Sequence, residues 1–169
     1  MTVVRGAMLA LLLATLACAD ERPRSLTEPP AAPPGASIAE LIVSDAAPYA
    51  GATITLTARV RPGARLAAVA SYKARLTYDP AGLTFVDAPS LPTGIRALNS
   101  GTAGTIVAAG AAPKGFTDGQ LFVVRFTVID PSALRRLELT VEQLGGSDFR
   151  DQLPALAARS GIHATGAAP

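Results

Sequence analysis

Few side chains in this sequence could perform chemistry. Among 169 residues there is one cysteine, Cys18, and one histidine, His163. A structural zinc site needs several cysteine or histidine ligands, and a disulfide within the chain needs two cysteines. His163 lies in a tail rich in Gly and Ala. We therefore expect a solvent-exposed histidine rather than a catalytic base, and neither a metal site nor another cofactor.

The carboxylates do not form a recognisable catalytic pattern. No H-E-x-x-H, P-loop, G-x-G-x-x-G or G-x-S-x-G motif occurs in the sequence. Glu138 and Glu142 share a strand face, but four strand residues span about 13 Å, which exceeds the spacing of glycosidase carboxylates. We therefore expect a protein that is not an enzyme.

An acidic loop is the other candidate for chemistry. Ser147, Asp148 and Asp151 could give oxygen ligands to calcium, but the loop lacks the D-x-[DN]-x-[DN]-G pattern of an EF-hand. An ordinary acidic loop is the favoured interpretation, and a calcium site is the alternative.

The N-terminus has the features of an export signal. Arg5 precedes an uncharged apolar run, residues 7–16, that would rise only about 15 Å as a helix, half of a bilayer core. The run ends in Thr15-Leu16-Ala17-Cys18, which resembles the bacterial lipoprotein signal, although Thr15 stands where that signal usually has Leu. The resemblance implies a signal peptide at 1–17 and acylation of Cys18, which would anchor the protein to the cell envelope, at the outer membrane or cell surface, through lipid alone.

Two other interpretations of this segment stay open. Ala17-Cys18-Ala19 also fits the A-x-A pattern of ordinary signal cleavage, which would release a soluble protein that begins at Asp20. An inert cysteine in a retained segment is the third. Residues 18–35 contain five prolines and no apolar periodicity, so we expect an extended linker before the folded domain.

The composition limits the classes of partner that this protein could bind. Fifteen Lys and Arg against thirteen Asp and Glu leave a formal charge of +2, which argues against a nucleic-acid binder held by phosphate contacts. A hydrophobic fraction of 49% and a charged fraction of 17% do not suit a disordered chain. One folded domain with a protein or carbohydrate partner fits these numbers.

The elements that must position any functional side chain are short strands. Apolar and polar residues alternate repeatedly, and the segments are separated by Gly and Pro turns. The expected strands are 38–43, 52–60, 70–78, 83–86, 95–98, 105–109, 120–129, 137–141 and 161–164. Eight or nine such strands predict an all-β fold, an antiparallel β-sandwich over 36–164, followed by a tail at 165–169.

The order of motifs resembles that of cohesin domains. Tyr78-Asp79-Pro80, followed by Leu83-Thr84-Phe85, resembles the YDP-x-x-L-x-F signature of that family. The segments 104–107, 117–119, 121–128 and 137–144 and the acidic loop 147–151 follow in the same order. The resemblance implies a sandwich of jelly-roll type and a non-catalytic binding or scaffolding module. Because cohesins bind dockerins, it also implies a protein partner, either dockerin-like or another envelope component.

The resemblance also suggests an interaction face. It implies that the strand ending at Tyr78 and the 120–129 strand share one sheet whose outer face docks partners. The outward rows would then be Ser71, Lys73, Arg75 and Leu121, Val123, Arg125. Apolar residues beside cations suit a partner with an acidic rim, whereas ordinary solvent-exposed positions are the alternative.

The positions of the aromatic residues bear on an alternative function, carbohydrate binding. Cohesin sandwiches are related to certain cellulose-binding modules, so a carbohydrate-binding module associated with polysaccharide is the alternative function. Such modules need rows of exposed rings, yet five of the eight aromatics fall at core positions: Tyr72, Tyr78, Phe85, Phe122 and Phe126. The remaining three, Tyr49, Phe116 and Phe149, are expected in loops and are too scattered to form a platform.

The lipoprotein interpretation predicts an acylated N-terminal cysteine. Mass spectrometry of the membrane fraction should find a mature chain that begins at Cys18 and carries acyl chains. An unacylated chain beginning at Asp20 would contradict this prediction.

Overall fold

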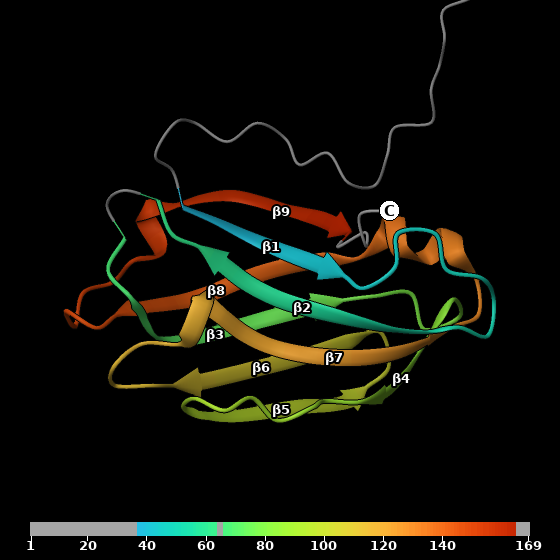
Figure 1. The fold of residues 1–169 in the computed structure, drawn as a ribbon, viewed down its shortest axis with the longest axis horizontal. Coiled ribbons are helices and arrows are strands. Elements are labelled where there is room, and N and C mark those ends of the chain that lie inside the picture. Colours follow the sequence, from blue (N-terminus) through green and yellow to red (C-terminus); the bar gives the residue numbers. More distant parts are fainter. Residues whose placement is uncertain (1–36, 64–65, 165–169) are drawn as a thin grey trace, which may run out of the picture.

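In the part of the chain that the structure describes, the alternating segments form nine strands in two stacked sheets (Figure 1). The computed structural model describes residues 37–63 and 66–164, with side chains as far as residue 156. The strands are β1 (Ser37–Val43), β2 (Thr53–Arg61), β3 (Val69–Thr77), β4 (Leu83–Asp87), β5 (Ile95–Thr102), β6 (Thr105–Ala111), β7 (Gln120–Val128), β8 (Glu138–Gly146) and β9 (Leu156–Ala164). The predicted all-β sandwich is confirmed.

Several predicted features lie outside the described part of the chain. These are the signal peptide 1–17, Cys18, the linker 18–35, the side chain of His163 and the tail 165–169. Three short 3₁₀ turns occur at Thr117–Gly119, Pro131–Arg136 and Leu153–Ala155. Within the described residues no helix has the length and apolar character needed to cross a membrane.

The two sheets differ in size and in one pairing. The larger sheet has the order β4-β7-β2-β1-β9 and the smaller has the order β5-β6-β3-β8. Neighbours are antiparallel except β1 and β9, which run parallel with Ser37 opposite Leu156. This parallel pair is a local exception in the predicted antiparallel sandwich. The last residues of β8 lie on the same side of the sandwich as the first residues of β1. The chain crosses to the other sheet there, and β9 then runs alongside β1.

The core lies between the sheets and takes one row from each central strand. On β2 the inward row is Ile54, Leu56, Ala58 and Val60, while the threonines between them face outward. Phe126 of β7 is at the centre of an aromatic cluster, because its ring centroid lies 4.8 Å from that of Tyr78 and 5.9 Å from that of Phe85. Edge-to-face packing of this kind adds to the stabilisation from apolar burial.

A set of hydrogen bonds from Arg96 and Tyr72 to β7, here called the polar clasp, joins the two sheets at one end of the core. The guanidinium of Arg96 on β5 donates to the carbonyl oxygens of Leu121 and Gln120 on β7, at 2.6 and 3.0 Å. It also lies 4.5 Å from the ring centroid of Phe116. The hydroxyl of Tyr72 donates to the same Leu121 oxygen at 2.6 Å, and burial raises the pKa of Tyr72 to about 12. The clasp satisfies polar groups that would otherwise be buried without partners.

Removing the central ring should destabilise the fold. Phe126→Ala deletes a fully buried side chain and is expected to lower the free energy of unfolding by about 3–5 kcal/mol, measured by urea denaturation. Phe149→Ala, at a residue 99% exposed, is the matched control and should leave the unfolding midpoint unchanged. Equal effects of the two substitutions would contradict the packing described above.

Candidate interaction face

The outer face of the four-stranded sheet carries the β3 row singled out in the sequence. Ser71, Lys73 and Arg75 point away from the core, because Tyr72, Ala74 and Leu76 between them are buried in it. The side chains of Lys73 and Arg75 are 44% and 45% exposed.

The second row does not lie on this face. β7 belongs to the five-stranded sheet, so the prediction that both rows share one sheet is wrong. The physical reason is that the inner rows of β3 and β7 are both strongly apolar and pack against each other across the sandwich. Leu121 is fully buried, since a β-bulge opposite Ala58 and Arg59 turns it into the core.

The other two residues of that row have separate roles. Val123 is 9% exposed and therefore buried. Arg125 is exposed on the outer face of the other sheet, where its Nε donates to Asp87 Oδ1 at 2.6 Å in a two-point ion pair. Neither residue can contribute to a surface centred on Lys73 and Arg75.

Instead, β6 and β5 continue the β3 face, and they make it apolar. The β3 row is paired with Ala111, Ala109 and Val107 of β6. These residues are paired in turn with Ile95, Ala97 and Asn99 of β5. Ile95 is 81% exposed, and Ala97, Ala109 and Ala111 are exposed as well. This apolar half was not predicted from the sequence, because small alanines give a weak hydrophobic signal although their outward positions follow from the register.

The β3–β8 half of the face is charged. Glu142 on β8 accepts from Lys73 Nζ at 2.7 Å and from Arg75 Nη2 and Nε at 2.6 and 2.9 Å. Hydrogen bonds from Lys73 and then Arg75 hold the pKa of Glu142 below its ordinary value. Two cations therefore share one carboxylate, which leaves one positive charge in this group.

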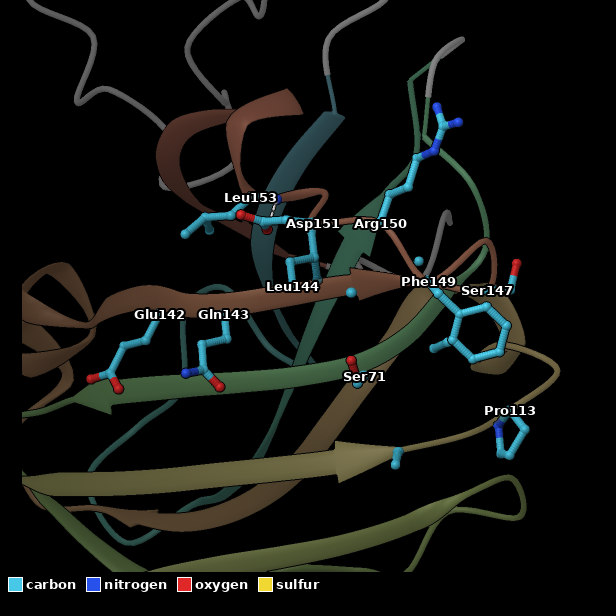
Figure 2. A pocket seen from close by; sticks show the side chains of 14 residues that line it. Ser71, Pro113, Glu142, Gln143, Leu144, Ser147, Phe149, Arg150, Asp151 and Leu153 are labelled. Carbon is cyan, nitrogen blue, oxygen red and sulfur yellow. Dashed lines mark hydrogen bonds between the residues drawn. The ribbon is translucent and has the colours of Figure 1, made fainter.

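A hollow of about 560 Å³ lies at one end of this face (Figure 2). Its walls come from β3, from residues 142–146 of β8, from the end of β6 and from the loop after β8. The lining residues outside β8 are Ala70, Ser71, Ala111, Pro113, Ser147, Phe149, Arg150, Asp151 and Leu153. Phe149 stands at the rim and is 99% exposed.

The acidic loop uses its carboxylates to fix its own backbone. Asp148 accepts from the backbone N–H of Arg150 at 3.2 Å and from Gln152 Nε2 at 3.1 Å. Asp151 accepts from the backbone N–H of Leu153 at 2.9 Å. In the described part of the chain, no three His, Cys, Asp or Glu residues lie together as a metal site would require.

The three rings expected in loops have different environments. Phe116 is only 5% exposed, because it packs edge-to-face on Tyr72 at 5.3 Å beneath the Arg96 guanidinium. Tyr49 is 75% exposed and belongs to the β1–β2 connection. That connection lies at the end of the sandwich opposite the loop that follows β8 (Figure 1), to which Phe149 belongs. The two exposed rings therefore cannot form one platform.

Comparison with known proteins identifies the fold. No protein-family model and no curated protein matches the sequence. Among solved structures, the chain is similar to a non-cellulosomal cohesin from the archaeon Archaeoglobus fulgidus, with TM-score 0.55 and 14% identity over 78% of this chain and 92% of that chain.

Two cohesins of Acetivibrio cellulolyticus are also similar. One is a type II cohesin solved in a cohesin–X–dockerin complex, with TM-score 0.53 and 12% identity over 77% of this chain and 96% of that chain. The other is the sixth cohesin of scaffoldin B, solved with a mutant dockerin, with TM-score 0.53 and 12% identity over 75% of this chain and 98% of that chain. The described residues thus have the cohesin fold, as the ordered series of motifs predicted.

The shared carboxylate predicts a specific titration. The pKa of Glu142, followed by carboxyl NMR, should lie below the ordinary value of a glutamate side chain, and Lys73→Met with Arg75→Met should raise it toward that value. A depressed folded pKa means that these ion pairs stabilise the protein above the unfolded pKa and cease to do so as the pH falls through the folded pKa. Arg125→Met is the control and should not move the Glu142 titration, and an unmoved pKa in the double variant would contradict the assigned contacts.

Proposed function

We propose that this protein is a non-catalytic binding module that docks another protein on the outer face of the β5-β6-β3-β8 sheet. The observation that carries the proposal is the composition of that face, which exposes an apolar strip beside a cationic pair. The cohesin fold adds support, since two similar cohesins were solved in complexes with dockerins.

The apolar strip favours a protein partner. Ile95, Ala97, Ala109 and Ala111 lie side by side on paired strands, so their exposed area is contiguous rather than scattered. Contiguous apolar surface of this kind is typical of interaction sites on soluble domains. Small side chains also keep the face flat, which lets a partner backbone approach closely.

The charged half favours a partner with acidic side chains. Lys73 and Arg75 share a single carboxylate, so an additional carboxylate from a partner meets a net positive charge. Complementary charge of this kind contributes specificity and a faster association rate. The partner is dockerin-like or another component of the cell envelope.

Acylation of Cys18 would hold this module on the envelope. Residues 18–35 would reach roughly 55 Å if extended as a proline-rich tether, far enough to lift the domain off a lipid surface. Release from Asp20 as a soluble protein is the alternative, and it leaves the docking face unchanged.

Charge reversal on the face tests the proposed function. An affinity pull-down from the native envelope with mass spectrometry should recover a protein partner with the wild-type chain and lose it with Lys73→Glu plus Arg75→Glu. Arg125→Glu is the matched control on the other sheet, and it should retain the partner. Unchanged capture by the double variant would contradict the proposal, and capture of polysaccharide alone would favour the carbohydrate-binding alternative.

A further inference from the structure

Arg59 and Arg96 are the half-buried arginines in the part of the chain that the structure describes, and their charges are met in different ways. The guanidinium of Arg59 forms an ion pair with the buried carboxylate of Glu40. The guanidinium of Arg96 has no carboxylate partner among the described residues. It donates instead to three backbone carbonyl oxygens, those of Thr93, Gln120 and Leu121. Its positive charge is therefore not neutralised within this part of the protein.

Arg96 also keeps unused hydrogen-bond donors. A guanidinium has five N–H groups, and Nε, Nη1 and Nη2 of Arg96 each use one of them in the contacts above. One N–H on Nη1 and one on Nη2 therefore have no acceptor among the described residues. Two such groups can donate to both oxygens of one carboxylate, and charge-assisted bonds of this kind are roughly twice as strong as neutral ones.

A pocket of about 260 Å³ lies beside the Arg96 side chain. Tyr72 of β3, Leu98 of β5 and Ala108 of β6 line it from the four-stranded sheet. Phe122 of β7 lines it from the five-stranded sheet. The pocket therefore lies between the two layers, on the side of the sandwich where β5 and β4 are the edge strands (Figure 1).

The pocket arises because β4 is shorter than its neighbour. β4 pairs with β7 only as far as Asp87, so residues 120–124 of β7 have no β4 partner. The connection 88–94, which follows β4, supplies much of the remaining wall. Gly94 fixes the point where this connection joins β5, because a Cβ there would lie only 2.8 Å from the ring of Phe116. The wall is therefore held against the core where it meets β5.

The residues that line the pocket limit its ligand. Arg96 is the only one of them that carries a charge, so it compensates one negative charge and would leave a second one unpaired. Most of the other lining side chains are apolar, among them Leu91, Leu98, Phe122 and Val123. At about 30 Å³ for each water molecule in the liquid, the pocket has room for roughly nine non-hydrogen atoms. The lining therefore suits a small molecule with one negative charge and an apolar body.

We propose that this pocket binds a small organic monocarboxylate, whose apolar body lies between the sheets and whose carboxylate accepts from Arg96. This site goes beyond the proposed docking of a protein and does not depend on it. The three hydrogen bonds to carbonyl oxygens, together with the Phe116 ring 4.5 Å away, orient the guanidinium before a ligand arrives. Apolar walls strengthen the ion pair, because they screen charge less than water does.

Benzoate is the probe for this site, since its size matches the pocket and it carries one negative charge. Benzamide is the neutral counterpart of nearly the same shape. Each is titrated into the isotope-labelled full chain and followed by NMR. Benzoate should shift the Arg96 Nε–H signal to saturation, and benzamide should leave that signal where it is.

Two substitutions locate the binding. Arg96→Met removes the charge and should lower benzoate affinity at least tenfold, since hydrogen bonds to charged groups contribute that much. Because this variant also loses three hydrogen bonds within the fold, a second variant leaves Arg96 in place. Ala88→Phe, at an exposed residue that lines the pocket, adds a ring at its mouth and should lower benzoate affinity at least tenfold without changing the melting temperature. Arg61→Met, at an exposed arginine outside the pocket, is the matched control and should leave the affinity unchanged.

The contrary outcomes separate this site from the docking face. An unmoved Arg96 signal in benzoate would overturn the proposal and leave Arg96 with a purely structural role toward β7. Equal binding of benzamide would overturn the carboxylate as the recognised group, and full affinity in Ala88→Phe would overturn the pocket as the site. Lys73→Glu with Arg75→Glu should bind benzoate as the wild type does, so loss of the protein partner and loss of benzoate are independent results.

Discussion

The packing of one apolar row from each central strand between the two sheets is the interaction on which the rest of this structure depends. Phe126 contacts Tyr78 from across the sandwich and Phe85 from its own sheet, so both layers are fixed around one ring. Because side chains alternate along a strand, burying Tyr72, Ala74 and Leu76 forces the intervening residues outward. The core therefore sets the outward direction of the cationic pair of β3.

The same alternation explains what the sequence could predict. It specified nearly every strand and the outward direction of the β3 row, and the ordered series of motifs indicated the fold. Alternation specifies which residues share a face, but it does not specify which strands are neighbours. The placement of β7 beside β3 was therefore taken from the family resemblance, and it is wrong. Strict alternation along the strand places Leu121 in the outward row. In the structure a β-bulge reverses the alternation at this point, and bulges leave no clear trace in a single sequence.

Long-range contacts account for the remaining differences. Phe116 and Phe149 both lie in short connections near glycines, so local sequence does not distinguish them. The first is buried because Arg96, twenty residues earlier in the chain, extends over its ring toward carbonyl oxygens of β7. The second has no such cover among the described residues and is held outward by the turn from Gly146 to Gln152. The distinction between a buried ring and an exposed ring thus arises from tertiary structure.

The arrangement of Glu142 bears on how such a face could discriminate between partners. Without a carboxylate between them, the positive charges of Lys73 and Arg75 would repel each other. Glu142 offsets this repulsion and keeps the two side chains close together in the free protein. Because Lys73 and Arg75 share one carboxylate, the three side chains carry a net charge of one. A partner that docked here would gain binding energy from one acidic side chain and little from a second. The alanine strip can bury area against many flat surfaces, which gives affinity without much selectivity. The spacing between the charged pair and the hollow is fixed by β3, because this strand contributes Ser71 to the hollow and both cations to the pair.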